Sequence, residues 1–482
     1  MAENKKFYIT TAIDYVNARP HIGHAFEKVL ADAIARWHKL QGDKVWFLTG
    51  TDENAQKNAQ VAEQEGMDVK KFVDRNTGYF IELCKILDVD YNRFIRTTEP
   101  GHKKIAQDIF KRAYDKGEIY KGKYEGWYCI GCEAFKTEKD LVGGKCPEHD
   151  KKPEWISEEA YFFKLSKYKN KLIKFVENYI VPESRRNEIL SRLKKEELKD
   201  LCVSRRNLDW GVDSPIDKKY KIYVWFDALI NYISGAEGNW PADVHVIGKG
   251  INWFHSVIWP AMLMSMEEKL PKTLLVHGYV NLKGQKISKS LGNVIDPVAL
   301  AKKYGADVVR YSLLRGSVFE DFDFSEEIIK ERNNELADKL GNLVSRLEGL
   351  AEKHGEIKKV SPDAALAKKL KLKEIESKMQ SYELDKALAI IIEFIDECNK
   401  YVQEKKIWEL SGEGRNKALY TVADSLRISA LLLHAFIPES SEKILKRLDE
   451  KKVSFSRIKF GLLGNLKLKR QEVLYAKVRW QT

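Results

Sequence analysis

The sequence predicts an α/β protein in which a parallel sheet is split by an insertion and followed by an all-helical region. Short β-rich runs alternate with helical patterns in residues 6–50 and again in residues 244–279, which is the order expected of β-α-β units. After Phe324 the strand-like runs stop, and long helical patterns with almost no proline replace them. These two observations define the predicted fold class.

The individual elements follow from the spacing of apolar residues. The expected strands are residues 6–12, 45–49, 244–248 and 273–279, and the expected helices beside them are residues 22–40 and 253–266. The first helix is assigned because its apolar side chains recur at helical spacing, and Gly42 is expected to end it. A helix between two buried strands implies a right-handed crossover, with helices covering both faces of the sheet.

Four segments result from this pattern. We expect residues 1–116 and 222–324 to be the two halves of one α/β domain, interrupted by an insertion at residues 117–221. Residues 325–482 should form a helical domain. The helices expected in that domain are residues 325–350, 364–405 and 418–434.

Composition indicates an ordinary globular protein of 482 residues, with 44% hydrophobic and 32% charged residues. No apolar stretch approaches the ~20 residues of a membrane span, and the first residues do not resemble a secretory signal. We therefore expect a cytoplasmic protein without a membrane partner. The net charge of +12 suits an acidic partner such as nucleic acid, although lysine-rich proteins without one are common.

Three of the six cysteines cluster with a histidine. Cys129 and Cys132, followed by Cys146 and His149, have the spacing of two knuckles facing one tetrahedral Zn²⁺. Such a set leaves no open coordination position, so we expect one structural zinc ion per chain. The alternative is three free thiols on a loop. The other cysteines are isolated in helical contexts and are expected to be buried apolar residues: Cys84, Cys202 and Cys398.

Two motifs have the chemistry of phosphate binding. His21 and His24 follow the first strand at the start of a helix, where both imidazoles share one face and the helix N-terminus attracts anions. Lys286 and Lys289 lie in a polar loop after a strand of the second half and could clamp a polyphosphate. Either motif alone could be a solvated surface feature. Their positions in opposite halves of one α/β pattern favour a shared site.

These motifs resemble those of a known family. His21-Ile22-Gly23-His24 and Lys286-Ile287-Ser288-Lys289-Ser290 resemble the HIGH and KMSKS signatures of class I aminoacyl-tRNA synthetases, with Ile287 in place of the usual Met. Residues 50–54, 223–229, 254–261 and 277–280 are similar to methionyl-tRNA synthetases in particular. The resemblance covers residues 6–438.

The resemblance implies a Rossmann-type catalytic domain, a zinc-bearing connective insertion and a helical-bundle anticodon-binding domain. It also implies a ligase that activates L-methionine with Mg²⁺-ATP to methionyl adenylate and then transfers methionine to the 3′ end of tRNA(Met). The catalytic residues it implies are His21, His24, Lys286 and Lys289. Those implied for ATP binding are His21, Gly23, His24, Glu27, Gly248, Val280 and Lys289.

The resemblance further implies an amino-acid pocket. Its residues are Ile13, Tyr15, Asp52, Trp225, Ala228, Leu229, Tyr232, Ile251 and His255. Asp52 can hold an ammonium group, and aromatic rings suit a thioether; without the family, Trp225 and His255 would be read as core residues. Two positions depart from the family. Leu229 replaces a usual Pro, and Gly250 replaces the Asp that helps hold the ATP ribose, so we expect weakened ATP binding.

The anticodon residues implied by the resemblance are Asn342, Arg346 and Trp408. Asn342 and Arg346 lie four apart on one expected helix, and an exposed Trp408 could stack on a base; the alternative is a capping Asn and a core Trp. Nothing similar to the family's dimerising C-terminal module follows, so we expect a monomer. Other readings are a class I synthetase for leucine, isoleucine, valine or cysteine, and a synthetase-like RNA-binding protein that has lost activation.

Overall fold

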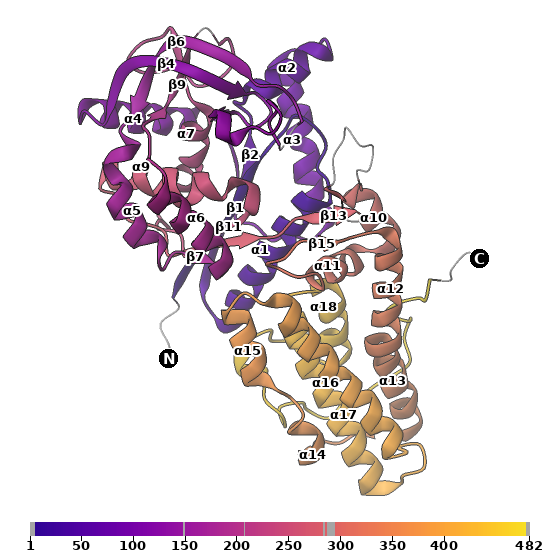
Figure 1. Ribbon diagram of the computed structural model, residues 1–482. Coiled ribbons are helices and arrows are strands. Elements are labelled where there is room, and N and C mark those ends of the chain that lie inside the picture. Colours follow the sequence, from indigo (N-terminus) through magenta and orange to yellow (C-terminus); the bar gives the residue numbers. More distant parts are fainter. Residues whose placement is uncertain (1–4, 148–149, 207, 283–284, 287–294, 479–482) are drawn as a thin grey trace.

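The computed structural model describes residues 5–147, 150–206, 208–282, 285–286 and 295–478 (Figure 1). The α/β part carries the antiparallel strands β4 (Ile119–Cys129) and β6 (Glu154–Phe163) at one end, and a group of long helices extends from its other end. Among the helices of these residues, none is long and apolar enough to cross a membrane.

A six-stranded parallel sheet forms the centre of the α/β part. In spatial order its strands are β3 (Arg93–Arg96), β2 (Lys44–Asp52), β1 (Lys6–Tyr15), β11 (Val244–Gly248), β12 (Thr273–His277) and β7 (Ile180–Val181). The predicted parallel α/β fold is therefore confirmed. The first two strands run further than expected, to Tyr15 and Asp52, and β7 comes from within residues 117–221, which were expected to lie outside this sheet.

Both faces of the sheet are covered by helices, as predicted. Alternate side chains of β1 enter different cores: Phe7 and Ile9 belong to one, Tyr8 and Ala12 to the other. The helices of the α/β part are α1 (Ile22–Gln41), α2 (Gln56–Gln64), α3 (Val69–Ile86), α4 (Pro100–Asp115), α7 (Val224–Leu229), α8 (Asn231–Ser234), α9 (Trp259–Met266), α10 (Pro297–Tyr304) and α11 (Ala306–Leu314). Helix α1 ends as predicted at Gly42, whose φ of 99° few other residues adopt.

Residues between β4 and α7 form a small antiparallel sheet with flanking helices. Its strand order is β5 (Ala134–Lys136), β4, β6 and β8 (Leu201–Cys202). The other elements there are α5 (Lys169–Val176), α6 (Glu183–Lys195) and the pair β9 (Ser204–Arg206) and β10 (Tyr220–Ile222). The three described cysteines of the cluster lie at the β4–β5 turn and in the loop before β6.

Helices dominate the chain after β15 (Phe322–Asp323). They are α12 (Glu326–Leu336), α13 (Asn342–His354), α14 (Ala364–Ala367), α15 (Leu372–Gln380), α16 (Leu384–Glu404), α17 (Gly412–Leu433) and α18 (Pro438–Arg447). A π-helical turn at Ala337–Gly341 joins α12 to α13. The single helix expected at residues 364–405 is broken into three, because the chain turns before α15 and again at Tyr382, whose φ is +60°. Strands β16 (Glu356–Ile357) and β17 (Leu466–Lys467) pair beside these helices.

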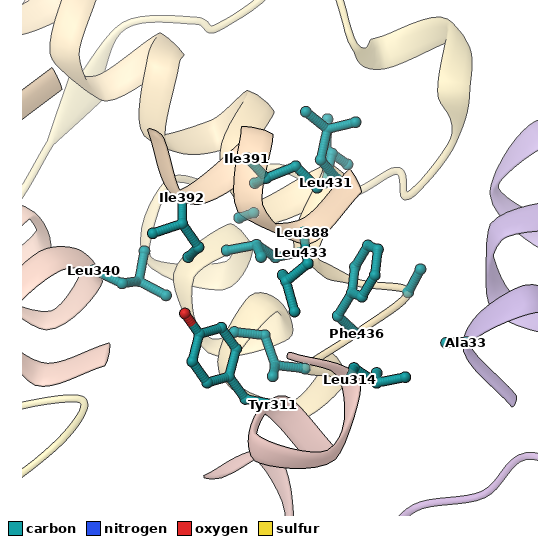
Figure 2. Close-up of a cluster of buried hydrophobic side chains, with 14 of the residues drawn as sticks. Ala33, Tyr311, Leu314, Leu340, Leu388, Ile391, Ile392, Leu431, Leu433 and Phe436 are labelled. Carbon is teal, nitrogen blue, oxygen red and sulfur yellow. The ribbon is translucent and has the colours of Figure 1, made fainter. Parts of the chain in front are cut away.

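One apolar core joins the helical region to the central parallel sheet. Figure 2 shows Leu388 and Ile391 of α16 and Leu431 of α17 in one buried cluster with Tyr311 of α11, with Ala33 of α1 at its margin. A fully buried Arg310 strengthens this junction. Its guanidinium lies 2.6 Å from Asp32 in α1 and donates a hydrogen bond to the Phe436 carbonyl at 2.9 Å. The helical region is thus anchored on the helix that begins at His21.

Candidate active site

The carboxyl ends of the central strands converge on one cavity. The strand order runs from β1 to β2 on one side and to β11 on the other, and ligands of parallel sheets bind in the crevice at such a switch point. A cavity of about 1140 Å³ opens there. All nine residues predicted for methionine line it: Ile13, Tyr15, Asp52, Trp225, Ala228, Leu229, Tyr232, Ile251 and His255. Of those predicted for ATP, the lining includes His21, His24, Glu27 and Gly248.

Two histidines begin helix α1 and cap it with their own rings. Nδ1 of His21 accepts a hydrogen bond from the Gly23 N–H at 3.1 Å, and Nδ1 of His24 accepts one from the His21 N–H at 3.0 Å. The rings stack with centroids 3.8 Å apart, on one face as expected. Because both Nδ1 atoms accept, each neutral imidazole carries its proton on Nε2. Each ring can therefore donate to a phosphate oxygen through Nε2.

Gly23 and Val280 were also predicted to bind ATP, but neither is among the described residues that line the cavity. A Cβ at Gly23 would lie 2.9 Å from Cε1 of His21, so this glycine makes room for the capping imidazole. Val280, in β13 (Val280–Leu282), is buried in the core between the sheet and α1. Neither residue faces the cavity. Gly23 makes room for the His21 ring, and Val280 packs in the core against α1.

Charged side chains lie buried beneath the two histidines. Nζ of Lys28 is 2.8 Å from Asp14 and 3.4 Å from Glu27, and Glu27 is 3.1 Å from Nε2 of His277. Burial raises the pKa of Asp14 to about 6 although Lys28 opposes the shift. Burial also acts to raise the pKa of Glu27, but Lys28 and His277 outweigh it and lower that pKa to about 2. The cavity wall thus holds an ionised carboxylate that can accept from nucleotide hydroxyls.

The predicted lysine clamp is described only at its start. Lys286 lies in β14 (Gln285–Lys286), whose backbone pairs with Asn281 of β13. Lys289 lies outside the described residues. Strand β13 follows β12, which ends beside β11 at the cavity, so β13 begins near the edge of the sheet where the histidines lie.

Aromatic rings form the apolar side of the cavity. Trp225 stacks on Phe254 with centroids 3.8 Å apart, and Tyr15 meets Trp225 edge-on at 6.3 Å. Phe254 lies in a π-helical turn, Phe254–Ile258, where the sequence predicts a regular helix. Such turns occur often at functional sites because they re-aim side chains. The resulting surface suits a polarisable thioether.

His255 is held as a neutral imidazole. Its Nδ1 donates to the Ile251 carbonyl at 3.0 Å, so Nε2 accepts from the Tyr232 hydroxyl at 2.7 Å. Burial lowers the pKa of His255 to about 4. An uncharged ring at this position keeps this side of the cavity compatible with an apolar side chain.

Asp52 is a buried carboxylate at the end of β2. Burial raises its pKa well above the ordinary value, and the neighbouring charges of Asp227 and Glu133 add to the shift. Asp227 is paired with His102 at 3.0 Å, whereas none of the ion pairs between described residues includes Asp52. A buried acid in this setting is stabilised by a cation that a ligand brings.

The segment around Gly250 is arranged differently from the family pattern. A Cβ at Gly250 would lie 2.2 Å from the hydroxyl oxygen of Tyr279. The backbone N–H of Tyr279 donates a hydrogen bond to the Asp321 carboxylate at 2.9 Å, and Nζ of Lys249 forms an ion pair with the same carboxylate at 2.7 Å. Nζ of Lys249 also lies 4.5 Å from the centre of the Tyr279 ring. The phenol therefore occupies the space in which the family's Asp side chain would begin.

The cysteine cluster fits a metal ion. The Sγ atoms of Cys129, Cys132 and Cys146 all lie within 4.8 Å of one another, and those of Cys132 and Cys146 are 3.4 Å apart. Zn–S bonds of ~2.3 Å in a tetrahedron place sulfur atoms about 3.8 Å apart. His149 lies outside the described residues. Cys84, Cys202 and Cys398 are buried, as predicted. Cys84 and Cys398 lie in helices, whereas Cys202 lies in strand β8 and not in the helical context that was expected.

The three residues predicted to read the anticodon lie on the helical region. Asn342 and Arg346 project from α13 toward α16, where they donate to Asn399 at 3.4 Å and to Gln403 at 3.1 Å. Trp408 follows α16 and is 43% exposed, so it is not the core residue that the alternative interpretation required. All three can be approached from solvent.

Sequence reasoning missed several residues of the site. Phe254 and Tyr279 lie within residues 254–261 and 277–280, two segments that are similar to methionyl-tRNA synthetases. That similarity could have indicated both residues as part of the site. Glu133 directly follows Cys132, and only the fold shows that it is buried, with 1% of its surface exposed. Lys57 lines the cavity from α2, which no motif indicated.

Comparison with family models identifies two regions. The model described as "tRNA synthetases class I (M)" matches residues 7–152 and 139–348. The model described as "Anticodon-binding domain of tRNA ligase" matches residues 366–466. Together they span the catalytic sheet, the insertion and most of the helical region.

Curated relatives and solved structures agree with these models. Methionine–tRNA ligase of Caldanaerobacter subterraneus subsp. tengcongensis is 43% identical, over 98% of this chain and 79% of its own length. That of Rickettsia bellii is 41% identical, over 92% of this chain and 93% of its own. Mycobacterium tuberculosis methionyl-tRNA synthetase in complex with methionyl-adenylate superposes with a TM-score of 0.93 at 37% identity, over 98% and 99% of the two chains. The chain therefore belongs to the methionyl-tRNA synthetases of class I.

Proposed function

We propose that this chain activates L-methionine with ATP in the cavity and transfers it to the 3′ end of tRNA(Met). The observation that carries the proposal is the convergence of the nine predicted methionine residues and the two helix-start histidines on one cavity. Aromatic rings and a neutral His255 provide a place for the thioether, and Asp52 provides one for the ammonium group. The side chain and the α-amino group of methionine thus have separate, chemically matched sites.

The activation step follows from this placement. A carboxylate oxygen of methionine forms a bond to the α-phosphorus of ATP as the bond to pyrophosphate breaks. His21 and His24 donate through Nε2 to phosphate oxygens on which charge builds up, and Lys286 and Lys289 supply positive charge from the loop after β13. Such chemistry needs positioning and charge stabilisation rather than a nucleophilic side chain. Glu27 and Gly248 border the nucleotide, and Mg²⁺ accompanies ATP as part of the substrate.

Residues that do not bind methionine or ATP have supporting roles in this proposal. Cys129, Cys132, Cys146 and His149 hold one structural Zn²⁺ within residues 117–221. Asn342, Arg346 and Trp408 read the anticodon from the helical domain, residues 325–482. The catalytic domain consists of residues 1–116 and 222–324, and the protein acts as a cytoplasmic monomer.

A charging assay with a loop variant tests the proposal. The protein should convert tRNA(Met) to its methionylated form with methionine and ATP, and Lys289→Ala should lower the rate of adenylate formation far more than it raises the methionine KM. A clamp that tightens on developing charge acts in the transition state. Equal losses in both quantities would remove Lys289 from the assigned role, and absence of charging would contradict the proposal.

A further inference from the structure

A buried acid outside the predicted pocket connects two walls of the methionine site. Glu133 follows Cys132 in the turn between β4 and β5, and it is 1% exposed. Its φ of +50° is in the left-handed region, which a non-glycine residue occupies only when its surroundings hold it there. None of the roles described above for the site or for the zinc cluster uses this side chain.

The carboxylate of Glu133 caps a helix of a different segment. Helix α2 has no side-chain cap from its own N-terminal residue, Ala55. Instead, the backbone N–H of Lys57 donates to Oε1 of Glu133 at 2.7 Å. A carboxylate at a helix N-terminus both accepts an unpaired N–H and interacts favourably with the helix dipole. Because α2 starts four residues after Asp52, this bond fixes the far end of the short loop that follows Asp52.

The same turn holds the opposite wall. Tyr128, which lines the cavity, donates its hydroxyl to Oε2 of Glu133 at 2.5 Å. The Tyr223 hydroxyl donates to the Glu133 backbone carbonyl at 2.6 Å, and Nε1 of Trp225 donates to the Cys132 carbonyl at 3.3 Å. Tyr223 and Trp225 begin helix α7, which presents the aromatic wall. The turn at Cys132 and Glu133 therefore contacts both sides of the pocket, the side of Asp52 and the aromatic side that begins at Tyr223, and fixes the distance between them.

We propose that Glu133 is a positioning residue of the methionine site, which sets the distance between Asp52 and the aromatic wall. Its two carboxylate oxygens and its backbone carbonyl hold α2, Tyr128 and Tyr223 together. This inference rests on the proposed function of the cavity. It predicts that a change at Glu133 raises the KM for methionine and leaves the KM for ATP nearly unchanged.

Glu133→Gln removes the charge and keeps the size of the side chain and one carbonyl acceptor. We expect the methionine KM in ATP–pyrophosphate exchange to rise about tenfold, since hydrogen bonds to charged groups have effects of that order. The ATP KM should change by less than about twofold, because the lost interaction concerns only one substrate. Zinc content and Tm should match wild type. The matched control is Glu138→Gln, an exposed acid of the same segment, which should leave both KM values unchanged.

Two competitive inhibitors separate a displaced Asp52, which affects only the ammonium group, from a general packing defect. Methioninol keeps the ammonium group, and 2-hydroxy-4-(methylthio)butanoate has a hydroxyl in its place. In Glu133→Gln, methioninol should bind more weakly by the same factor as methionine, while the hydroxy acid binds as it does to wild type. Equal weakening of both inhibitors, or an unchanged methionine KM, would overturn the inference.

A second variant covers the case in which Glu133→Gln does not fold. Tyr128→Phe keeps the ring and the Glu133 charge but removes the hydroxyl that orients Oε2, and it should raise the methionine KM about threefold with the ATP KM unchanged. An unchanged methionine KM in that variant would also overturn the inference. Wild-type protein serves as the reference: if it shows no methionine-dependent exchange, the proposed function fails, whereas normal wild-type exchange with unaltered variants contradicts only the role of Glu133.

Discussion

Gly250→Asp should restore the family's carboxylate without improving ATP binding. The resemblance alone would lead to the opposite expectation, because a charge-assisted hydrogen bond to a ribose hydroxyl contributes ~1.5–3 kcal/mol, or about tenfold or more in affinity. In the structure, however, the new Cβ would lie 2.2 Å from the Tyr279 hydroxyl oxygen. Tyr279 must move, and the move gives up the contact of the Lys249 ammonium group with its ring, which contributes ~0.5–2 kcal/mol. The two effects are of similar size, so the single variant should show unchanged or weaker ATP binding.

Removing the Tyr279 hydroxyl should allow Gly250→Asp to tighten ATP binding. In Tyr279→Phe the nearest remaining ring atom is 3.5 Å from the Cβ position, an ordinary contact. We therefore expect the double variant Gly250→Asp/Tyr279→Phe to bind ATP about tenfold more tightly than Tyr279→Phe alone. The measurement is the ATP KM in methionine-dependent pyrophosphate exchange for wild type, the two single variants and the double variant. These four values give the coupling free energy between the two substitutions. Tighter ATP binding in the single Gly250→Asp variant, or additive effects in the cycle, would refute this reasoning.

Three further results are expected. Trp408→Ala should lower charging at limiting tRNA by roughly ten- to a hundredfold through loss of a stacked base, while tRNA-independent pyrophosphate exchange stays at the wild-type level; loss of both together would make Trp408 a structural residue. Elemental analysis should find about one zinc per chain, and Cys146→Ser should lower that content, since three thiolates and an imidazole form a closed set; zinc-free, stable wild-type protein would exclude the metal. Burial lowers the pKa of His255 from 6.5 to about 4, so at this group the unfolded state binds more protons across that window, and the contribution of His255 to the free energy of unfolding should fall by up to about 3 kcal/mol as the pH decreases from 6.5 to 4. His255→Gln should flatten that part of the stability curve, and an equally steep curve in the variant would assign the titration to another group.

Patterned features of this chain could be predicted from sequence because their cause is local. The strand at Val244–Gly248 and the end of α1 at Gly42 are read directly from apolar runs and from a residue that tolerates positive φ. The spacing of His21 and His24 placed their rings on one face before any fold was known. Motifs of this kind encode their geometry within one or two turns of chain.

Features that depend on distant segments could not be predicted. Strand β7 joins the main sheet only because β12 lies beside it, and residues 180–181 alone are too short to show a pattern. The buried state of Glu133 depends on α2 and on Tyr223, which approach it from separate parts of the chain. The close approach of the Tyr279 hydroxyl to Gly250 likewise involves two segments that follow different strands, β11 and β12. Each of these contacts is set by tertiary packing.

The central claim is that this cavity activates methionine. Methionine-dependent exchange of radiolabelled pyrophosphate into ATP, measured without tRNA and repeated with leucine, isoleucine, valine, cysteine and homocysteine, tests it most directly. The account predicts rapid exchange with methionine, weak exchange with homocysteine because an apolar pocket rejects a missing methylene by only ~1–3 kcal/mol, and background rates with the others. No exchange with methionine, or faster exchange with another amino acid of the set, would contradict it.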